Sequence, residues 1–127
     1  MLVYRVVDQN GDGMYRASTM DNNDCLWHKC CDDYDDDEHH PAPSGINHKI
    51  CVKFLDNHPS DFFFGFSSLD QLNHWIFEDE WKEKMHLEAG KVLVFDVKPS
   101  HCVFDEHQVA FLMEEAFCVR ELSILEV

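Results

Sequence analysis

The spacing of apolar residues changes along this chain of 127 residues, and it predicts where strands and helices lie. Residues 2–7 alternate between two faces, with Val3 and Arg5 on one of them, which is typical of a strand. Residues 62–66 predict a second, aromatic strand that Gly65 interrupts. The first and the middle part of the chain are therefore each expected to contribute a strand.

A helix is expected directly after the aromatic strand. Apolar residues recur at helical spacing over residues 69–76, and Ser68 stands where its hydroxyl can cap the helix. Gln71 lies three residues further on and can complete a capping box. A second helical pattern covers residues 78–88, and we expect Gly90 to take the left-handed conformation that ends it.

The last third of the chain predicts mostly strands. Residues 91–97, 108–113 and 117–127 are rich in apolar and β-branched side chains, and turn residues separate them. The order of elements predicts an α+β fold with a mainly antiparallel sheet and one or two helices. We expect residues 1–127 to form a single domain, with a long acidic loop over about residues 20–45.

The charge balance narrows the kinds of partner that this chain can bind. It has 25 acidic and 10 basic residues, which gives a formal net charge of −15. Direct binding to nucleic acid or to an anionic membrane is therefore disfavoured, because phosphates would repel the protein. The same charge is compatible with a basic protein or nucleoprotein complex as partner. Ordinary solubility is the simpler explanation that competes with this one.

The cysteines are expected to be mostly reduced. No stretch approaches the roughly 20 apolar residues of a membrane span, and no signal-peptide core is evident, so we expect a cytoplasmic protein. Disulfides are rare in that compartment. Cys51, Cys102 and Cys118 lie among apolar residues and are predicted to be small core residues.

A metal site is weakly indicated within the acidic loop. Thiolates and imidazoles are ligands that zinc prefers, and Cys25 and His28 have ligand-like spacing. No paired Cys-x-x-Cys units accompany them, so a polar loop without metal is the favoured interpretation, and no cofactor is expected. The candidate ligands are Cys25, His28, Cys30 and His39.

Three short motifs together resemble the ADP-ribosyltransferase-like fold. Tyr4-Arg5 matches the first strand of those enzymes, residues 66–68 match their strand end before a helix, and residues 105–111 lie where their late strand begins. The resemblance implies an NAD-dependent activity. The residues that it places in such a site are Arg5, Ser67, Ser68 and Glu106.

One residue departs from the pattern of that family. Gln108 stands where those enzymes carry the glutamate that stabilises the ribosyl cation. A glutamine carries no negative charge, so this stabilisation would be lost. Three explanations stay open: the alignment is off by two residues, the site is catalytically inactive, or the fold serves binding.

The chain also resembles small phage and prophage proteins. The resemblance rests on Tyr4-Arg5, on the segments 40–43 and 65–72, and on Gln-Val-Ala-Phe at 108–111. It implies a counter-defence protein that acts in the bacterial host cytoplasm, such as an inhibitor of a CRISPR or restriction complex.

The leading hypothesis is therefore a non-enzymatic inhibitor that occupies a basic, nucleic-acid-binding surface of a host defence protein. An NAD-dependent ADP-ribosyltransferase that modifies a host protein is the alternative, and a zinc-stabilised interaction module is a third. The oligomeric state stays open. The carboxylates expected to contact the partner are Asp32, Asp33, Asp35, Asp36, Asp37, Glu38, Glu78, Asp79, Glu80 and Glu83.

Overall fold

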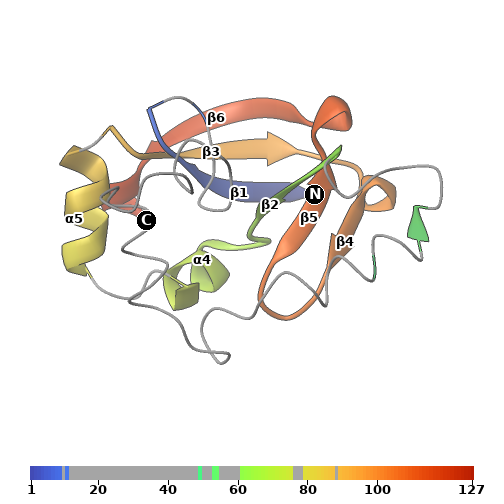
Figure 1. The fold of residues 1–127 in the computed structure, drawn as a ribbon, viewed down its shortest axis with the longest axis horizontal. Coiled ribbons are helices and arrows are strands. Elements are labelled where there is room, and N and C mark those ends of the chain that lie inside the picture. Colours follow the sequence, from blue (N-terminus) through green and yellow to red (C-terminus); the bar gives the residue numbers. More distant parts are fainter. Residues whose placement is uncertain (10, 12–48, 50–52, 55–60, 76–78, 88) are drawn as a thin grey trace.

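Two three-stranded antiparallel sheets form the framework of the protein (Figure 1). The structure is a computed structural model that describes residues 1–9, 11, 49, 53–54, 61–75, 79–87 and 89–127. Within these ranges the elements are β1 (Leu2–Val7), β2 (Phe62–Gly65), α4 (Leu69–Trp75), α5 (Asp79–Leu87), β3 (Lys91–Asp96), η2 (Pro99–His101), β4 (Cys102–Phe104), β5 (Val109–Leu112), η3 (Met113–Glu115), β6 (Phe117–Ser123) and η4 (Ile124–Glu126). The η elements are single turns of 3-10 helix.

The two sheets have different strand orders and meet at one point. The first sheet has the order β1-β3-β6 and the second the order β2-β5-β4. They are joined where Tyr4 of β1 pairs with Phe66, directly after β2. Tyr4 N–H donates to the Phe66 carbonyl oxygen at 2.8 Å, and Phe66 N–H donates to the Tyr4 carbonyl oxygen at 2.7 Å. The end of β2 is thereby fixed against β1.

Glycine is required at position 65 because β2 approaches β1 so closely there. A Cβ atom on Gly65 would lie 2.7 Å from the Tyr4 carbonyl oxygen and 2.7 Å from Cγ1 of Val3. The first of these neighbours is backbone that is itself held in β1, so it cannot move aside cheaply. The glycine that interrupts the aromatic strand in the sequence is therefore the residue that allows the two sheets to meet.

Three apolar clusters fill the space around the sheets. Phe95 of β3 and Phe111 of β5 belong to the cluster between the sheets, and their ring centroids lie 5.5 Å apart. A further cluster covers the other face of the second sheet, where the Phe54 and Phe62 ring centroids lie 5.0 Å apart. Both faces of β5 are therefore buried, which explains its uninterrupted apolar sequence.

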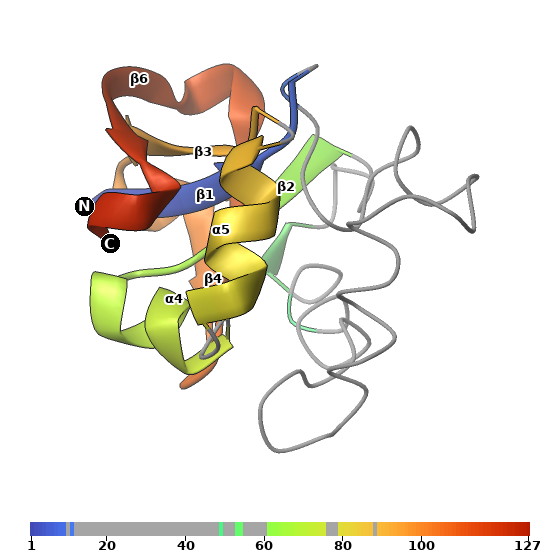
Figure 2. The same ribbon diagram turned by 90° about the vertical axis from the view of Figure 1, so that its left-hand side faces the viewer.

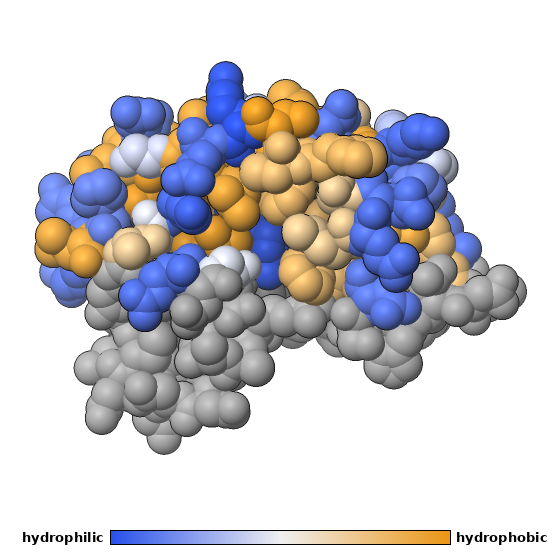
Figure 3. Space-filling view, turned by 90° about the horizontal axis from the view of Figure 1, so that it is seen from above, coloured by the Kyte–Doolittle hydropathy of each residue, from blue (hydrophilic) through white to orange (hydrophobic). Residues whose placement is uncertain are grey.

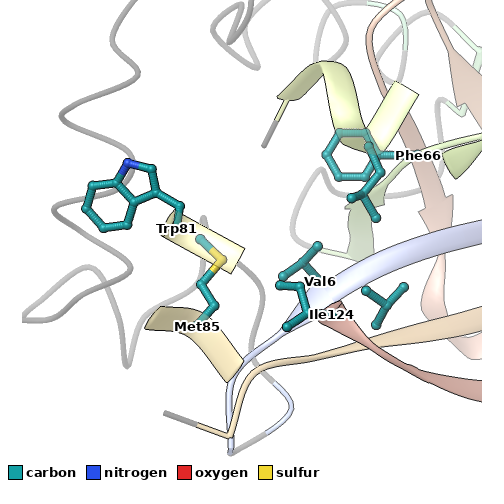
Figure 4. Packing of buried hydrophobic residues seen from close by; sticks show 7 residues of the cluster. Val6, Phe66, Trp81, Met85 and Ile124 are labelled. Atoms are coloured by element: carbon teal, nitrogen blue, oxygen red, sulfur yellow. The ribbon is translucent and has the colours of Figure 1, made fainter. Parts of the chain in front are cut away.

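The remaining cluster lies between the first sheet and the helices. Figure 2 shows α5 against the end of the first sheet, with β1 and β3 behind it. Trp81 and Met85 are the buried residues of α5, four positions apart and so on one face of the helix. Met85 is fully buried and packs in a cluster with Val6 of β1 and Ile124 of η4 (Figure 4).

The end of α5 differs from the expectation. The Gly90 N–H donates to the Met85 carbonyl oxygen at 2.7 Å and the Ala89 N–H to the His86 carbonyl oxygen at 3.0 Å, which is a Schellman motif. Ala89 takes the left-handed conformation, with φ 62°. The prediction that Gly90 would occupy this position was wrong, since the motif begins one residue earlier and Gly90 lies buried just before β3.

The predicted fold class is confirmed, and several boundaries are corrected. The structure has an α+β arrangement with antiparallel sheets, and β1, β2, β3, β5, α4 and α5 lie where the sequence pattern places them. The pattern gave no indication of η2 or β4. The last strand is shorter than expected, because the chain turns into η4 at Ile124, whose side chain is buried.

Two of the three cysteines predicted for the core are described. Cys102 is buried, but Cys118 is exposed, because β6 is an edge strand whose Cys118 position is not covered. Cys51 lies outside the described residues. None of the helices in the part of the chain that the structure describes is long and apolar enough to cross a membrane.

We expect Gly65→Ala to lower the free energy of unfolding by about 1–3 kcal/mol, because the new methyl group overlaps the Tyr4 carbonyl oxygen. Urea denaturation followed by circular dichroism measures the change. Ser67→Ala, at an exposed position two residues away, is the control and should change stability by no more than about 0.5 kcal/mol. A Gly65→Ala protein as stable as the wild type would contradict the close contact.

Ala89→Gly should raise the free energy of unfolding by about 0.5–1 kcal/mol, because glycine adopts positive φ without the strain that alanine carries. Ala116→Gly is the matched control, since Ala116 has φ −103° and gains nothing from a glycine. That substitution should destabilise the protein by a similar amount. Changes of the same sign in the two variants would rule out the left-handed Ala89.

Candidate functional site

Arg5 is a buried connection between β1 and β2. Its side chain is only 4% exposed, and Nη1 donates a hydrogen bond to the Phe64 carbonyl oxygen at 2.6 Å. Its guanidinium carbon also lies 4.7 Å from the centroid of the Phe63 ring, a distance at which cation–π attraction acts. These contacts place the only cation of the first strand inside the junction of the two sheets.

Ser68 caps helix α4. The Gln71 N–H donates to Ser68 Oγ at 3.0 Å, which satisfies one of the free backbone donors in the first turn. The carboxylate of Asp70 adds negative charge to the same turn. The capping predicted from the sequence is therefore present, and the Ser68 hydroxyl is engaged in it.

The reciprocal bond of the capping box goes to Ser67 instead of Ser68. Gln71 Oε1 accepts hydrogen bonds from the Ser67 N–H at 2.8 Å and from Ser67 Oγ at 3.3 Å. In a regular capping box the third helical residue bonds to the backbone N–H of the cap itself. Here it reaches one residue further back, so both serines are held by Gln71.

Gln71 also connects this junction to the hairpin between β4 and β5. Its Nε2 donates to the Glu106 carbonyl oxygen at 3.0 Å. Gln71 thereby links Ser67, Ser68 and the backbone of Glu106. The local spacing around Gln71 indicates only its capping role, because nothing in that spacing points to a contact 35 positions away.

The hairpin is held by a side-chain turn at Asp105. Asp105 Oδ1 accepts hydrogen bonds from the backbone N–H groups of His107 at 2.8 Å and of Gln108 at 2.9 Å. The Asp105 N–H donates to the Gln108 carbonyl oxygen at 3.1 Å. This arrangement is an Asx turn, and it places Glu106 at the tip of the hairpin.

Glu106 and Gln108, the two residues that the resemblance places in the site, differ strongly in exposure. The Glu106 side chain is 84% exposed, and its Oε1 lies 3.3 Å from Nε2 of His107. Gln108 is only 2% exposed and is neutral. A positive charge that developed on a sugar here would meet one solvated carboxylate, and water screens such a charge strongly.

Helix α5 carries three of the carboxylates assigned to partner binding. Asp79, Glu80 and Glu83 are all exposed. Lys84 Nζ lies 2.9 Å from Glu80 Oε1, an exposed pair one helical turn apart. With three carboxylates and two lysines the helix has a net charge of −1, so it adds little to the charge of the molecule.

Lys82, the other lysine of α5, connects parts of the fold. Lys82 donates to Asn73 Oδ1 of α4, and to the Val127 carbonyl oxygen at 3.1 Å. It ties the two helices to the end of the chain. Glu78 and the run from Asp32 to Glu38 lie outside the described residues.

The candidate zinc ligands also lie outside the described residues; they are Cys25, His28, Cys30 and His39. Among the residues that the structure does describe, no group of three or more His, Cys, Asp or Glu side chains could hold a metal ion.

Cys102 behaves as a core residue. Burial raises the pKa of the Cys102 thiol, and the nearby Lys53 ammonium lowers it in part. Its Sγ lies 3.6 Å from the Lys98 carbonyl oxygen, a weak hydrogen bond of a protonated thiol. A thiol with a raised pKa is a poor nucleophile at neutral pH, so Cys102 is not a catalytic candidate.

A surface hollow of about 490 Å³ lies at the end of α5. Its charged lining includes Lys91 and Glu121, whose Nζ and Oε2 lie 3.2 Å apart. Because these charges pair with each other, the hollow offers no unbalanced charge to select a ligand. The complete lining is His86, Ala89, Gly90, Lys91, Glu121, Leu122 and Ser123.

Comparison with known proteins gives one match. The family model described as Bacteriophage T4 Y00F protein matches residues 1–125, nearly the whole chain. No curated protein and no solved structure matches. The resemblance to the ADP-ribosyltransferase-like fold therefore stays a prediction, whereas the resemblance to phage proteins is confirmed.

Proposed function

Because the chain belongs to the bacteriophage T4 Y00F protein family, we propose that it is a phage-encoded, non-enzymatic inhibitor of a host defence protein. Its carboxylates would occupy a basic surface on which that protein binds nucleic acid. The observation that carries the proposal is the net charge of −15 and its uneven distribution. Eight acidic residues and one lysine lie between Asp21 and Glu38, which accounts for −7 of the total.

The acidic run has the charge density that nucleic-acid mimicry needs. Residues 32–38 contain six carboxylates in seven positions, with Tyr34 as the seventh. Each strand of B-DNA carries about one negative charge per 3.4 Å of axis, which is close to the roughly 3.3–3.6 Å per residue of an extended chain, and proteins contact DNA with clustered lysine and arginine. A dense run of carboxylates competes for the same cations, and its attraction for them falls as salt screens it.

Ion pairs among the described residues support Asp32–Glu38 as the main contact with the partner. On α5 the Glu80 carboxylate already pairs with Lys84, and on the first sheet Glu121 pairs with Lys91. Exposed pairs of this kind are largely neutral toward a distant partner. We therefore expect Asp32–Glu38 to contribute most of the attraction for the basic partner, and Asp79 and Glu83 to contribute less.

One observation favours a second candidate function, an NAD-dependent ADP-ribosyltransferase. β2 pairs with β5 in antiparallel register, and Gln71 connects Ser67 to Glu106. These contacts gather the motifs that resemble those enzymes. The engaged hydroxyl of Ser68, the buried Arg5 and the neutral Gln108 are the reasons for ranking this function second.

Charge reversal tests the leading proposal. A variant with Asp35→Lys, Asp36→Lys and Asp37→Lys should lose capture of its partner from host lysate, because the cationic surface would now be repelled. Wild-type capture should fall at least tenfold between about 50 mM and 500 mM salt. The captured protein should bind DNA when it is alone and not when it is bound to this protein.

The control for charge reversal changes the net charge by the same amount at other exposed carboxylates. It carries Asp70→Lys, Glu106→Lys and Glu126→Lys, three positions far apart in the sequence. We expect it to capture the partner nearly as well as the wild type. Capture that survives the reversal at positions 35–37, or that does not depend on salt, would refute the proposal.

A labelling experiment separates the two candidates. Incubation of the protein with host lysate and NAD labelled in its ADP-ribose part should give no labelled host protein. An inhibitor that binds through its carboxylates needs no cofactor. Label that is transferred by the wild type and lost in Glu106→Ala would establish the second candidate in place of the first.

A further inference from the structure

The outer edge of the first sheet is long and carries exposed apolar side chains. β6 lies at the end of the order β1-β3-β6, and its first five residues are exposed. Phe117 is 73% and Val119 is 56% exposed. A strand edge of seven residues that displays apolar side chains can accept a further strand through its backbone.

Carboxylates flank these apolar residues. Leu2, Asp96 and Phe117 are register partners in one row across the first sheet, and all three are exposed. Glu114 and Glu115 of η3 lie three and two residues before Phe117 and are also exposed, and neither forms an ion pair with another described residue. Figure 3 looks onto this side of the molecule and shows an apolar area between hydrophilic residues.

The charges argue against a second copy of the chain at this edge. Two molecules with a net charge of −15 each repel one another. If two β6 strands paired symmetrically about their centres, Arg120 would also face its own copy. The register between β3 and β6 shifts at Val94 and Phe95 and leaves Val119 of β6 without a partner, and this β-bulge distorts the edge for a long, flat pairing. A basic partner avoids the repulsion between net charges, and it avoids the repulsion at Arg120 where an apolar residue of the partner lies opposite that position.

We propose that the β6 edge binds an extended, basic segment of the partner as an additional strand. Apolar side chains of that segment would cover Phe117 and Val119, and its lysines or arginines would lie near Glu114 and Glu115. The basic character of the partner rests on the proposed function, whereas the position of the edge rests on the exposure of β6 alone. The acidic run and the β6 edge would then be two separate contacts with one partner.

A synthetic peptide of ten residues that alternates valine and lysine, with both ends blocked, is the probe. We expect it to bind the full-length protein at about 50 mM salt and to slow hydrogen exchange of the backbone amides of β6. Two further peptides serve as controls: one with glutamate in place of lysine, and one with N-methylated backbone amides. Neither should bind, because the first carries the wrong charge and the second lacks the donors that strand pairing needs.

Substitutions at the edge complete the test. Phe117→Ser with Val119→Ser should weaken binding of the valine-lysine peptide at least tenfold, and both positions are exposed enough for the fold to be retained. The matched control is Leu87→Ser with Phe104→Ser, two exposed apolar residues outside β6, which should leave binding unchanged. Peptide binding without protection of β6 amides, or binding indifferent to positions 117 and 119, would overturn the proposal.

Two further outcomes have a defined meaning. Wild-type protein that sediments as a dimer and becomes monomeric in the Phe117→Ser, Val119→Ser variant would overturn the proposal, because a second copy would then occupy the edge. If this variant captures the host protein undiminished while the reversal at positions 35–37 abolishes capture, the proposed function stands and the edge is not a contact. If only the edge variant loses capture, the edge stands and the acidic run does not.

Discussion

The close approach of Gly65 to β1 is the contact on which the rest of the structure depends. Two backbone hydrogen bonds between Tyr4 and Phe66 join two sheets that have no other strand pairing between them in the described part of the chain. A side chain at position 65 would separate them. Arg5 of β1 donates a hydrogen bond to the Phe64 carbonyl oxygen of β2, so the cation of the first strand also stabilises this junction. The direction of α4, and with it the position of Ser67 relative to the β4–β5 hairpin, follows from how β2 leaves this point.

Much of the fold could be predicted from local spacing, and the failures have physical reasons. Alternation over β1 and the uninterrupted apolar sequence of β5 reflect one sheet face or two faces that are buried. β4 has only three residues and follows a proline turn, so no alternation could identify it. Glycine is the residue most often found in the left-handed conformation at the end of a helix, so the sequence predicts that conformation for Gly90. The hydrogen bonds of the Schellman motif at the end of α5 give it to Ala89 instead.

The candidate site was predictable only where its contacts are local. The cap at Ser68 involves a partner three residues away, and the sequence indicated it. The bond from Gln71 to Glu106, and the burial of Arg5 and Gln108, depend on how β1, β2 and β5 come together. The distribution of charge, in contrast, can be read without the structure, because the density of carboxylates between Asp21 and Glu38 is a property of the sequence itself. The functional proposal therefore rests more on composition, and the structural account more on tertiary contacts.

The single side chain of Gln71 has a mechanical consequence. Its amide accepts a hydrogen bond from the Ser67 N–H and donates one to the Glu106 carbonyl oxygen, so it connects the start of α4 to the tip of the β4–β5 hairpin. A molecule that bound the hairpin and pulled it away would have to break the hydrogen bond from Gln71 Nε2 to the Glu106 carbonyl oxygen. The side-chain NH2 group of Gln71 is thus an internal gauge of strain at the hairpin, which lies on a different element from the surfaces proposed to bind a partner.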